Sequence, residues 1–505
     1  MAAPIIGIDL GTTNSCAAVV GEAGEVKLIP YKGGDFIVPS VVAVDGRGRE
    51  LIGQEAKRQA QLNPLNTIYA SKRLIGRPYR SEVVEKMRRL VPYGLAEDAH
   101  GGVVLKVGKS TRTLSEIAAR VLAKIRDVAQ EHLHQAIDRA VVTVPAYFTD
   151  RQRQAVKEAG RIIGLSIVRI INEPTSAALA YGAGKKLHER VVIYDLGGGT
   201  FDVSVIEIRD RIFEVRATGG DMFLGGIDFD DAIIRHVLDG FRRKHGIDLT
   251  TDPVAMQRMK DLAERTKIDL SARREAPFHV PFVAMSPQGQ PLNIETAFDR
   301  ALLERLTSPL VDRTIAIVED VLAASELTAV DIDEVLLVGG QSRMPLVQEK
   351  IAKLFGKPPS KGVHPDEAVA IGAALYAHSL EENSPLRLQL LDVIPMAIGL
   401  ERADGSFHVV FPRNAPIPNA KVVQATTSYA GQTELAVRIW QGDHARAGEN
   451  ELLGDFLFSG LRKGRKGEAQ VEIIFDVNVE GILTMRAQDQ ATGKAIKTTI
   501  RVTQS

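Results

Sequence analysis

Two glycine-rich turns in this 505-residue chain contain the residue types needed to hold phosphate groups. The second turn, DLGGGTFD at 195–202, has three consecutive glycines, which leave its backbone free to adopt positive φ and to approach a ligand closely. Successive N–H groups in such a turn form a concavity that binds anions, and the aspartates at its two ends suit a hydrated hard cation. The first turn, DLGTTNS at 9–15, repeats this arrangement. The repetition predicts a duplicated fold that closes on one nucleotide from both sides.

The predicted strands and helices bring further polar residues toward these turns. Alternating apolar residues around each turn predict a pair of antiparallel strands. A strand predicted at 167–171 ends just before Glu173, and Pro174 can begin a helix there because its missing N–H costs nothing in a first turn. We therefore expect Glu173 to face a cleft. Lys72 belongs to a basic pair of a kind that is usually a solvated surface feature, and only the two turns make it a candidate for a charge aimed at a phosphate.

A helix predicted from 256 to 271 has a polar face. Glu264, Lys267 and Ser271 are spaced i, i+3 and i+7 and are expected to project from that face. A stripe of this kind is usually solvated, so alone it is a weak indicator of function. Glycine pairs at 225–226 and 339–340 precede further predicted helices.

Pro145 marks the end of another predicted strand. Proline fixes φ and removes a donor, so it indicates a rigid bend at this point. Asp150 is expected to cap the helix that follows, from 151 to about 163.

The composition excludes several classes of protein. Lysine plus arginine and aspartate plus glutamate both total 63, and this balance argues against a nucleic-acid partner. The single Cys16 excludes an internal disulfide framework, fits a reducing compartment and is expected to be a buried small hydrophobe. The first residues lack the features of a signal peptide, and no apolar run approaches membrane-spanning length. The sequence predicts a soluble cytoplasmic protein without a membrane partner.

The character of the sequence changes after residue 380. A linker at 383–392 contains the apolar residues Leu388, Leu390 and Leu391 within polar surroundings. From 393 to 505, short alternating segments separated by glycine, proline and asparagine replace the helical patterns, which predicts an all-β domain.

The motifs together resemble the seventy-kilodalton heat-shock (DnaK-type) chaperone family over essentially the whole chain. The segments that carry the resemblance, in chain order, are 7–15, 71–76, 144–148, 171–175, 195–202, 338–345 and 365–369.

The resemblance implies an α/β actin-like fold with two duplicated lobes at 1–382, a linker at 383–392 and a β-sandwich at 393–505 that binds peptides. It also implies an ATPase that uses ATP, ADP, Mg²⁺ and potassium, and couples nucleotide state to the binding of extended apolar polypeptide segments. J-domain co-chaperones and a nucleotide-exchange factor are the expected protein partners.

Roles for individual residues follow from the same resemblance. The expected catalytic residues are Asp9, Lys72, Glu173, Asp195 and Thr200. Residues expected to hold magnesium, mostly through water, are Asp9, Asp195 and Asp202. Residues expected to contact the phosphates and adenosine are Thr12, Thr13, Gly197, Gly198, Gly199, Gly225, Gly226, Glu264, Lys267, Ser271, Gly339, Gly340, Arg343 and Asp366. Because hydrolysis needs an in-line water and a neutralised γ-phosphate, Lys72 and magnesium are expected to supply the positive charge.

A second set of residues is expected to connect the nucleotide with the sandwich. The relay is expected to use Pro145, Arg153, Leu390, Leu391 and Asp392, while Arg169 matches a position that meets J-domain partners. The peptide groove is expected to be lined by Leu400, Ala425, Thr426, Leu435, Val437, Val471 and Ile473.

Three features depart from the family pattern. The sequence ends at Ser505, where the family continues into a helical lid, so the lid is expected to be absent. The arch over the groove is altered at Arg402, Ala403 and Ser428, and Leu435 is bulkier than the usual valine.

Two other functions remain open from the sequence. A metabolic kinase on the same scaffold would need a phosphate acceptor, and the leucine-containing linker and β-domain argue against it. A nucleotide-gated scaffold or filament protein is the second alternative, although filament relatives lack the appended sandwich.

Overall fold

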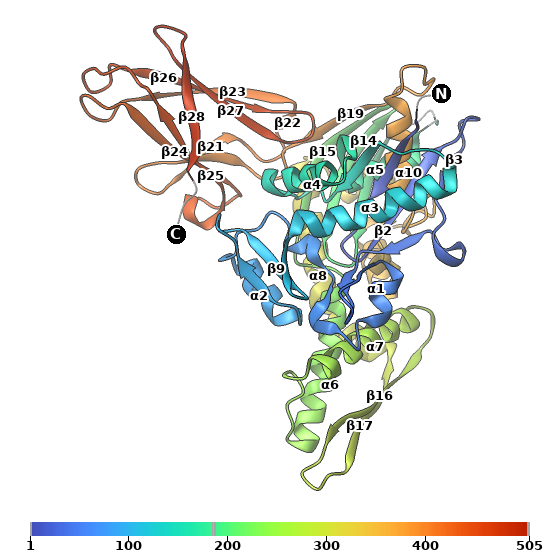
Figure 1. Cartoon of the computed structure of the whole chain (residues 1–505). Coiled ribbons are helices and arrows are strands. Elements are labelled where there is room, and N and C mark those ends of the chain that lie inside the picture. The colour runs from blue at the N-terminus through green and yellow to red at the C-terminus, as the bar shows by residue number, and fades with distance from the viewer. Residues whose placement is uncertain (1–2, 184, 186–187, 502–505) are drawn as a thin grey trace.

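The computed structural model describes residues 3–183, 185 and 188–501. Figure 1 shows two lobes, coloured blue to light orange, beside a separate darker orange-to-red unit of strands near the C-terminus. The predicted fold class, an actin-like α/β part followed by a β-sandwich, is confirmed.

The central sheet of lobe I has the strand order β12-β11-β1-β2-β3, with β4 paired to β2. Strands β1 and β2 form the first predicted hairpin, and β11 lies parallel to β1. The bounds of these strands are β1 Ile5–Asp9, β2 Asn14–Val20, β3 Val26–Leu28, β4 Ile37–Pro39, β11 Arg139–Val144 and β12 Ser166–Asn172.

The central sheet of lobe II repeats this plan. Its order is β18-β13-β14-β15-β19-β22, with β13 and β14 forming the second hairpin and β18 parallel to β13. The bounds are β13 His188–Leu196, β14 Phe201–Arg209, β15 Ile212–Asp221, β18 Glu334–Val338, β19 Gln389–Val393 and β22 Pro416–Ile417. The duplication predicted from the two turns is therefore present in the topology.

Helices α5 and α10 cross between the two central sheets. Both are rich in alanine and glycine, and a Cβ added to Gly372 of α10 would lie 1.7 Å from the backbone oxygen of Ser176 in α5. Only a helix of small residues permits this approach, which holds the two lobes together behind the turns. The ten helices of the described residues are α1 Gln54–Gln59, α2 Glu82–Leu90, α3 Leu114–Leu133, α4 Asp150–Ile162, α5 Glu173–Gly182, α6 Gly226–His245, α7 Pro253–Ala272, α8 Arg300–Ala324, α9 Pro345–Phe355 and α10 Ala368–Ser379.

Smaller strands and short helices build the walls above the two central sheets. In lobe I these strands are β5 Val42–Val44, β6 Glu50–Ile52, β7 Thr67–Ile68, β8 Leu95–Glu97, β9 Val103–Val107 and β10 Ser110–Thr113, and in lobe II they are β16 Glu275–Met285 and β17 Pro291–Asp299. Short 3-10 helices occur at Lys32–Gly34, Pro64–Asn66, Ser71–Arg73, Ala329–Asp331, Gly340–Arg343 and Ala447–Glu449.

The C-terminal strands form a sandwich. Their hydrogen-bonded order is β21-β20-β24-β25-β28-β27-β26-β23, and apolar side chains of both layers, among them Phe458 and Phe475, share one core. The bounds are β20 Ile398–Glu401, β21 Phe407–Phe411, β23 Asn419–Thr426, β24 Glu434–Gln441, β25 Glu451–Ser459, β26 Gln470–Val477, β27 Leu483–Asp489 and β28 Ala495–Arg501.

Two local predictions can be judged directly. Cys16 is buried in β2, where burial raises the pKa of its thiol to about 12, so it is an inert core residue as expected. The predicted cap of α4 is wrong. Thr149, not Asp150, is the N-cap, because its hydroxyl and the side chain of Gln152 form a capping box. Asp150 is instead the first residue of the helix.

Candidate functional site

The two glycine-rich turns face each other across the junction of the lobes. A Cβ added to Gly198 would lie 2.0 Å from the hydroxyl of Thr13, and one added to Gly199 would lie 2.3 Å from the methyl of Thr12. The glycines of the second turn are therefore required so that the first turn can come this close.

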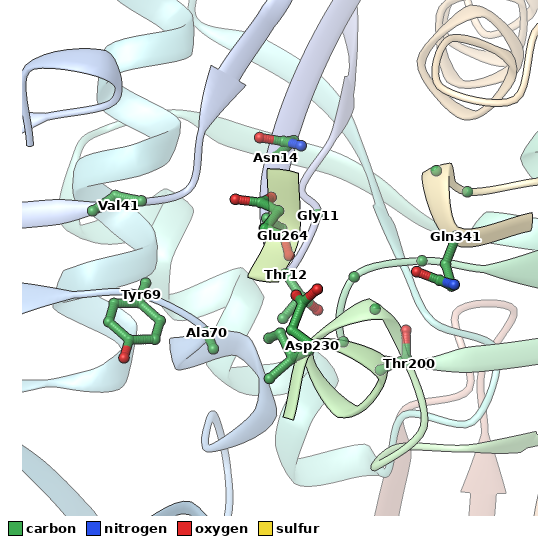
Figure 2. A pocket seen from close by; sticks show the side chains of 18 of the residues that line it. Gly11, Thr12, Asn14, Val41, Tyr69, Ala70, Thr200, Asp230, Glu264 and Gln341 are labelled. Atoms are coloured by element: carbon green, nitrogen blue, oxygen red, sulfur yellow. The ribbon is translucent and has the colours of Figure 1, made fainter. Parts of the chain in front are cut away.

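A cavity of about 600 Å³ opens beside this contact. Figure 2 shows side chains of both lobes around it, among them Thr12 and Tyr69 from lobe I and Thr200, Asp230 and Glu264 from lobe II. Sixteen of the predicted site residues line the cavity: Asp9, Thr12, Thr13, Glu173, Asp195, Gly197, Gly198, Gly199, Thr200, Gly226, Glu264, Lys267, Gly339, Gly340, Arg343 and Asp366. Lys72, Asp202, Gly225 and Ser271 do not line it.

One buried hydroxyl indicates what the cavity accepts. The Oγ1 atom of Thr13 is buried and has no hydrogen-bond partner within the described part of the chain. A buried polar group without a hydrogen-bond partner is costly, so a bound group that accepts a hydrogen bond from this hydroxyl would stabilise the site. A phosphate oxygen held by the backbone N–H groups of both turns fits this requirement.

Three carboxylates, those of Asp9, Glu173 and Asp195, line the cavity near the turns, and that of Asp202 lies beside them behind the wall. Burial raises the pKa of Asp9 to about 7 and that of Asp202 to about 8, in both cases with a further contribution from the negative charge of Glu173. Burial, followed by the charges of Glu173, Asp202 and Asp9, also holds the pKa of Asp195 well above its ordinary value. The base of the cavity therefore carries more negative charge than its surroundings compensate, and a bound cation would relieve this.

The residues present fit magnesium bound mainly through water and phosphate. No group of three histidine, cysteine or carboxylate side chains in the described ranges converges as a direct ligand set. Magnesium usually keeps several waters and binds through one or two carboxylates plus substrate phosphates, which agrees with Asp9 and Asp195 at the cavity wall. Asp202 lies directly opposite Asp195 in the β13–β14 ladder and accepts a hydrogen bond from the backbone N–H of Tyr147 at 3.1 Å.

Lys72 is placed just behind the cavity wall. Its Nζ donates to Glu173 Oε1 at 2.6 Å and to the backbone oxygen of Leu10, and its side chain is 7 % exposed. Glu173 begins α5 and lines the cavity, as the sequence predicted. Two acceptors, the backbone oxygen of Leu10 and the carboxylate of Glu173, therefore hold the lysine beside the first turn.

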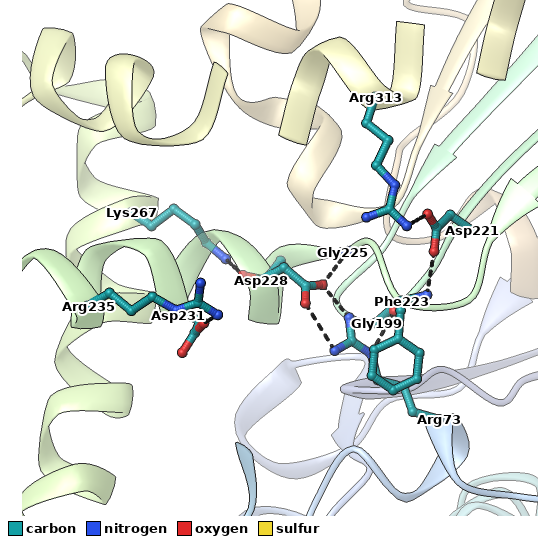
Figure 3. Close-up of polar contacts among 11 residues, drawn as sticks. Arg73, Gly199, Asp221, Phe223, Gly225, Asp228, Asp231, Arg235, Lys267 and Arg313 are labelled. Carbon is teal, nitrogen blue, oxygen red and sulfur yellow. Dashed lines mark hydrogen bonds and ion pairs between the residues drawn. The ribbon is translucent and has the colours of Figure 1, made fainter. Parts of the chain in front are cut away.

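Arg73, for which the sequence indicates no role, joins the two lobes. Its Nε donates to the backbone oxygen of Gly199 at 2.8 Å, and its guanidinium pairs with Asp228 of α6 at 2.5 Å over the ring of Phe223 (Figure 3). Asp228 also accepts from the backbone N–H of Gly225 at 2.8 Å. The second turn and the start of α6 are therefore fixed by one buried arginine from lobe I.

Replacing Arg73 with methionine is expected to lower the thermal unfolding midpoint of the nucleotide-free protein by several degrees. The change leaves Asp228 without its charge partner, and breaking a buried pair in this way costs roughly 3–5 kcal/mol. Arg235→Met is the matched control, because the side chain of Arg235 is 75 % exposed where it pairs with Asp231 of the same helix, and a pair with an exposed partner contributes about 0–1 kcal/mol. Equal midpoints for the two variants would contradict the role given to Arg73.

The opposite wall contains the residues predicted to hold adenosine. Arg343 donates to Asp366 at 2.5 Å, and a Cβ on Gly340 would lie 3.3 Å from Asp366. Lys267 pairs with Asp230 at 2.9 Å and donates to the backbone oxygen of Gly226. These contacts fix Lys267 at the start of α6.

Of the predicted stripe on α7, only part reaches the cavity. Glu264 and Lys267 line it, and so does Ile268, which is apolar and lies outside the predicted polar stripe. Ser271 donates to the backbone oxygen of Lys267 along its own helix. A contact between Ser271 and adenosine stays a prediction.

Further residues of α7 close the cavity on the side away from the turns. Lys260 donates to the hydroxyl of Tyr69 at 2.9 Å, and Lys57 pairs with Glu264 at 3.2 Å. Burial lowers the pKa of Lys260 to about 8. These contacts between lobes join residues about 190–210 positions apart, and no local pattern indicates them.

The leucine-containing linker is part of the lobe II sheet. Strand β19 lies parallel to β15, with Leu390 opposite Phe213 and Leu391 opposite Glu214. The carboxylate of Asp392 then accepts from the side chains of Asn172 at 2.8 Å and Thr175 at 3.2 Å. Asn172 and Thr175 flank Glu173, so the linker contacts the segment that positions a cavity carboxylate.

The sandwich packs against lobe I through buried charges. Arg153 is buried and donates to the backbone oxygens of Ala146, Phe148 and Glu480, and burial lowers its pKa. Arg169 donates to the backbone oxygen of Val479. Arg153, predicted to act in a relay, and Arg169, predicted to meet J-domain partners, therefore both lie in the interface between lobe I and the sandwich.

Other contacts in this interface were not anticipated. Glu451 pairs with Arg77 and accepts from Thr149 at 3.2 Å. Asp150 accepts from the backbone N–H of Leu483 at 2.8 Å. Pro145 directly follows the last residue of β11. The next residue, Ala146, accepts a hydrogen bond from Arg153 through its backbone oxygen.

The residues predicted to line the peptide groove come from both layers of the sandwich: Leu400, Leu435 and Val437 from β20 and β24, and Ala425, Val471 and Ile473 from β23 and β26. Val471 and Ile473 are fully buried in the core between the layers, whereas Leu400, Ala425, Leu435 and Val437 are half-buried and pack on the same core. Thr426 is exposed and, because side chains alternate along β23, it points to the opposite face from Ala425.

The two segments predicted to form the arch over this groove make their backbone hydrogen bonds with other partners. Hydrogen bonds join the 402–406 turn to the 445–447 segment, from Phe407 N to Ala445 O and from Ala447 N to Gly405 O. The backbone N–H of Ser428 is bound instead by Gln432.

Comparison with known families gives one full-length match. A family model described as Hsp70 protein matches residues 5–505. In the part of the chain that the structure describes, every helix is too short or too polar to cross a bilayer.

Proposed function

The chain belongs to the Hsp70 family of ATP-dependent chaperones, and we propose on this premise that it hydrolyses magnesium-bound ATP between the two turns and couples hydrolysis to the binding of extended apolar polypeptide. The observation that carries the proposal is the contact of Asp392 with Asn172 and Thr175. Through it, the strand that leads into the sandwich contacts residues on both sides of Glu173 in the sequence.

The chemistry proposed for the cavity depends on charge and position. The backbone N–H groups of both turns and the Thr13 hydroxyl bind the phosphates, while Asp9 and Asp195 hold the hydrated metal. Magnesium, when bound, supplies positive charge to the phosphate oxygens. Lys72 adds charge from lobe I, and Glu173 orients the attacking water while it holds Lys72 in place.

The sandwich is proposed to bind its polypeptide along the half-buried residues Leu400, Ala425, Leu435 and Val437. Apolar pockets of this kind give specificity to an extended chain, whose main-chain hydrogen bonds give affinity. J-domain and nucleotide-exchange partners are proposed because family members generally bind them.

Removing magnesium tests the ATPase proposal. Phosphate release from ATP is expected with Mg²⁺ and is expected to fall to the background rate when EDTA is added, because the four carboxylates and the phosphates then repel each other. Full recovery on adding excess Mg²⁺ is the control for irreversible damage. Hydrolysis that continues in EDTA would contradict the proposal.

Docking of the sandwich on lobe I is expected to depend on pH through Asp150. Burial raises the pKa of this carboxyl from 3.8 to about 6, so docking favours its protonated form. Relative to a fully solvated carboxyl, this stabilisation is complete below about pH 4 and is lost as the pH rises through about 6, at a total cost of about 3 kcal/mol, of which docking accounts for the part that comes from burial by the sandwich.

Asp150→Asn is therefore expected to dock more strongly than the wild type at pH 7.5, with a difference that narrows toward pH 4. The amide keeps an oxygen for the N–H of Leu483, and the Gln154 amide can turn its own oxygen toward the new N–H group. Resistance of the 383–392 linker to proteolysis measures docking. Asp138→Asn, at an exposed carboxylate, is the control, and faster cleavage of Asp150→Asn than of the control at pH 7.5 would contradict the expectation.

A further inference from the structure

A dense group of cations lies in the loop between β25 and β26. Arg462, Lys463, Arg465 and Lys466 occupy four of five consecutive positions, and all four are exposed. None of them forms an ion pair within the described residues. The chain as a whole has no net charge, so this concentration is local. We call these four residues the basic loop.

The basic loop has a defined structure. The backbone N–H of Gly431 donates to Gly464 O at 2.8 Å, and that of Gly467 donates to Thr427 O at 2.9 Å. Glu468 accepts from the backbone N–H of Arg465 at 2.7 Å and so stabilises the turn, while a second carboxylate, that of Asp489 on β27, lies near enough to Arg462 to interact with its charge. Like charges within a Debye length repel. Of the four cations, Arg462 donates to the backbone oxygen of Glu468 at 3.2 Å, and the turn is otherwise held by main-chain hydrogen bonds, so it has no need of four cations.

The topology places the basic loop at one end of the proposed groove. The loop runs directly into Gln470 and Val471, which pair with Thr426 and Ala425. The segment that it binds, 427–433, runs directly into β24, which carries Leu435. An extended polypeptide advances about 3.3 Å per residue, so the residues just beyond an apolar segment in the groove would reach the cations.

We propose that the basic loop selects polypeptide segments in which acidic residues flank the apolar core. This inference rests on the proposed peptide-binding function. Arginine and lysine form charge-assisted hydrogen bonds with carboxylates, and exposed charges of this kind contribute specificity and association rate more than raw affinity. A typical nucleic-acid site makes roughly 6–10 phosphate contacts. The basic loop offers four cations and one exposed aromatic residue in the adjacent segment, Tyr429, so it fits a short acidic peptide better than a nucleic acid.

The test uses the full chain with ADP and Mg²⁺ and two fluorescent peptides with the same leucine-rich core. One peptide carries three glutamates on each side and the other carries three glutamines. Anisotropy titrations at low salt are expected to give about tenfold tighter binding of the glutamate peptide, because several exposed pairs contribute a few tenths of a kcal/mol each. The difference is expected to disappear at high salt.

Neutralising the basic loop separates its role from that of the groove. In the variant R462Q/K463Q/R465Q/K466Q, the glutamate peptide is expected to lose its advantage while the affinity for the glutamine peptide is unchanged. The variant R243Q/K244Q removes exposed cations at the end of α6 and is expected to keep the wild-type preference.

Each alternative outcome has a definite meaning. Equal affinities of the wild type for both peptides, or a preference that survives neutralisation of the basic loop, would overturn the inference and leave the proposed function intact. Binding of neither peptide would overturn peptide binding itself and this inference with it. Loop-dependent binding of a twenty-nucleotide oligothymidylate, together with equal peptide affinities, would assign the surface to nucleic acid instead.

Discussion

Lys72→Ala is expected to reduce ATP hydrolysis on the order of 10²–10³-fold, the usual effect of removing one preorganised group that stabilises transition-state charge. Lys72 is held between Glu173 and the backbone oxygen of Leu10, so its charge is fixed before the reaction begins. Nucleotide affinity is expected to change much less, because the backbone of both turns remains. Single-turnover hydrolysis of preformed ATP complex and equilibrium nucleotide binding measure the two effects separately.

Lys57→Ala is the matched control for this prediction. Lys57 also lies at the cavity, but it is partly exposed and pairs with Glu264 at the side away from the turns. The single-turnover rate of the Lys57→Ala variant is expected to match that of the wild type. Lys72→Ala leaves the buried carboxylate of Glu173 unpaired and can destabilise the protein. If it unfolds, Lys72→Gln replaces it in the test, because glutamine keeps a hydrogen-bond donor for that carboxylate. A Lys72 variant that hydrolyses ATP at the wild-type rate would contradict the role proposed for the lysine.

Replacing Leu390 and Leu391 with aspartate is expected to uncouple the sandwich from the ATPase. Both leucines lie in β19, and Leu390 packs on the apolar core between the lobes. Two carboxylates cannot be buried there without a large cost, so β19 is expected to leave the sheet. Stimulation of ATP hydrolysis by an apolar peptide should then disappear. This corresponds to the loss of a coupling free energy of roughly 1–3 kcal/mol between the peptide site and the ATPase site.

Gln389→Asp provides the comparison for this variant, because Gln389 is in the same strand but its side chain is exposed. It is expected to keep both docking and peptide stimulation. Proteolysis of the linker supplies a second readout: cleavage of the double variant should be equally fast with ATP and with ADP. Peptide stimulation that persists in the double variant would rule out β19 as the connection.

The duplicated lobes and most of the cavity lining could be predicted because their signals are local. Each turn has its glycines, threonines and aspartate within nine positions, and an apolar strand precedes each of them. Glu173 could be predicted because a strand end and a proline-initiated helix meet at that point.

The contacts between separate parts of the chain could not be predicted in this way. Arg73 and Asp228 are 155 positions apart, and Asp150 and Leu483 are 333 positions apart. Asp150 looked like a helix cap because aspartate often has that role, but Thr149 takes it and leaves the carboxylate free to bind the sandwich. The stripe on α7 was only partly informative, since helical spacing identifies a shared face but not how far the cavity extends along it.

The most direct test of the account is the release of a bound fluorescent apolar peptide from the wild-type protein after addition of ATP or ADP. If nucleotide between the turns is connected to the sandwich through Asp392 and β19, ATP should accelerate release relative to ADP on the order of tenfold, and the Leu390→Asp/Leu391→Asp variant should lose this difference. Equal release rates with ATP and ADP from the wild type would contradict the coupling on which the proposed function depends.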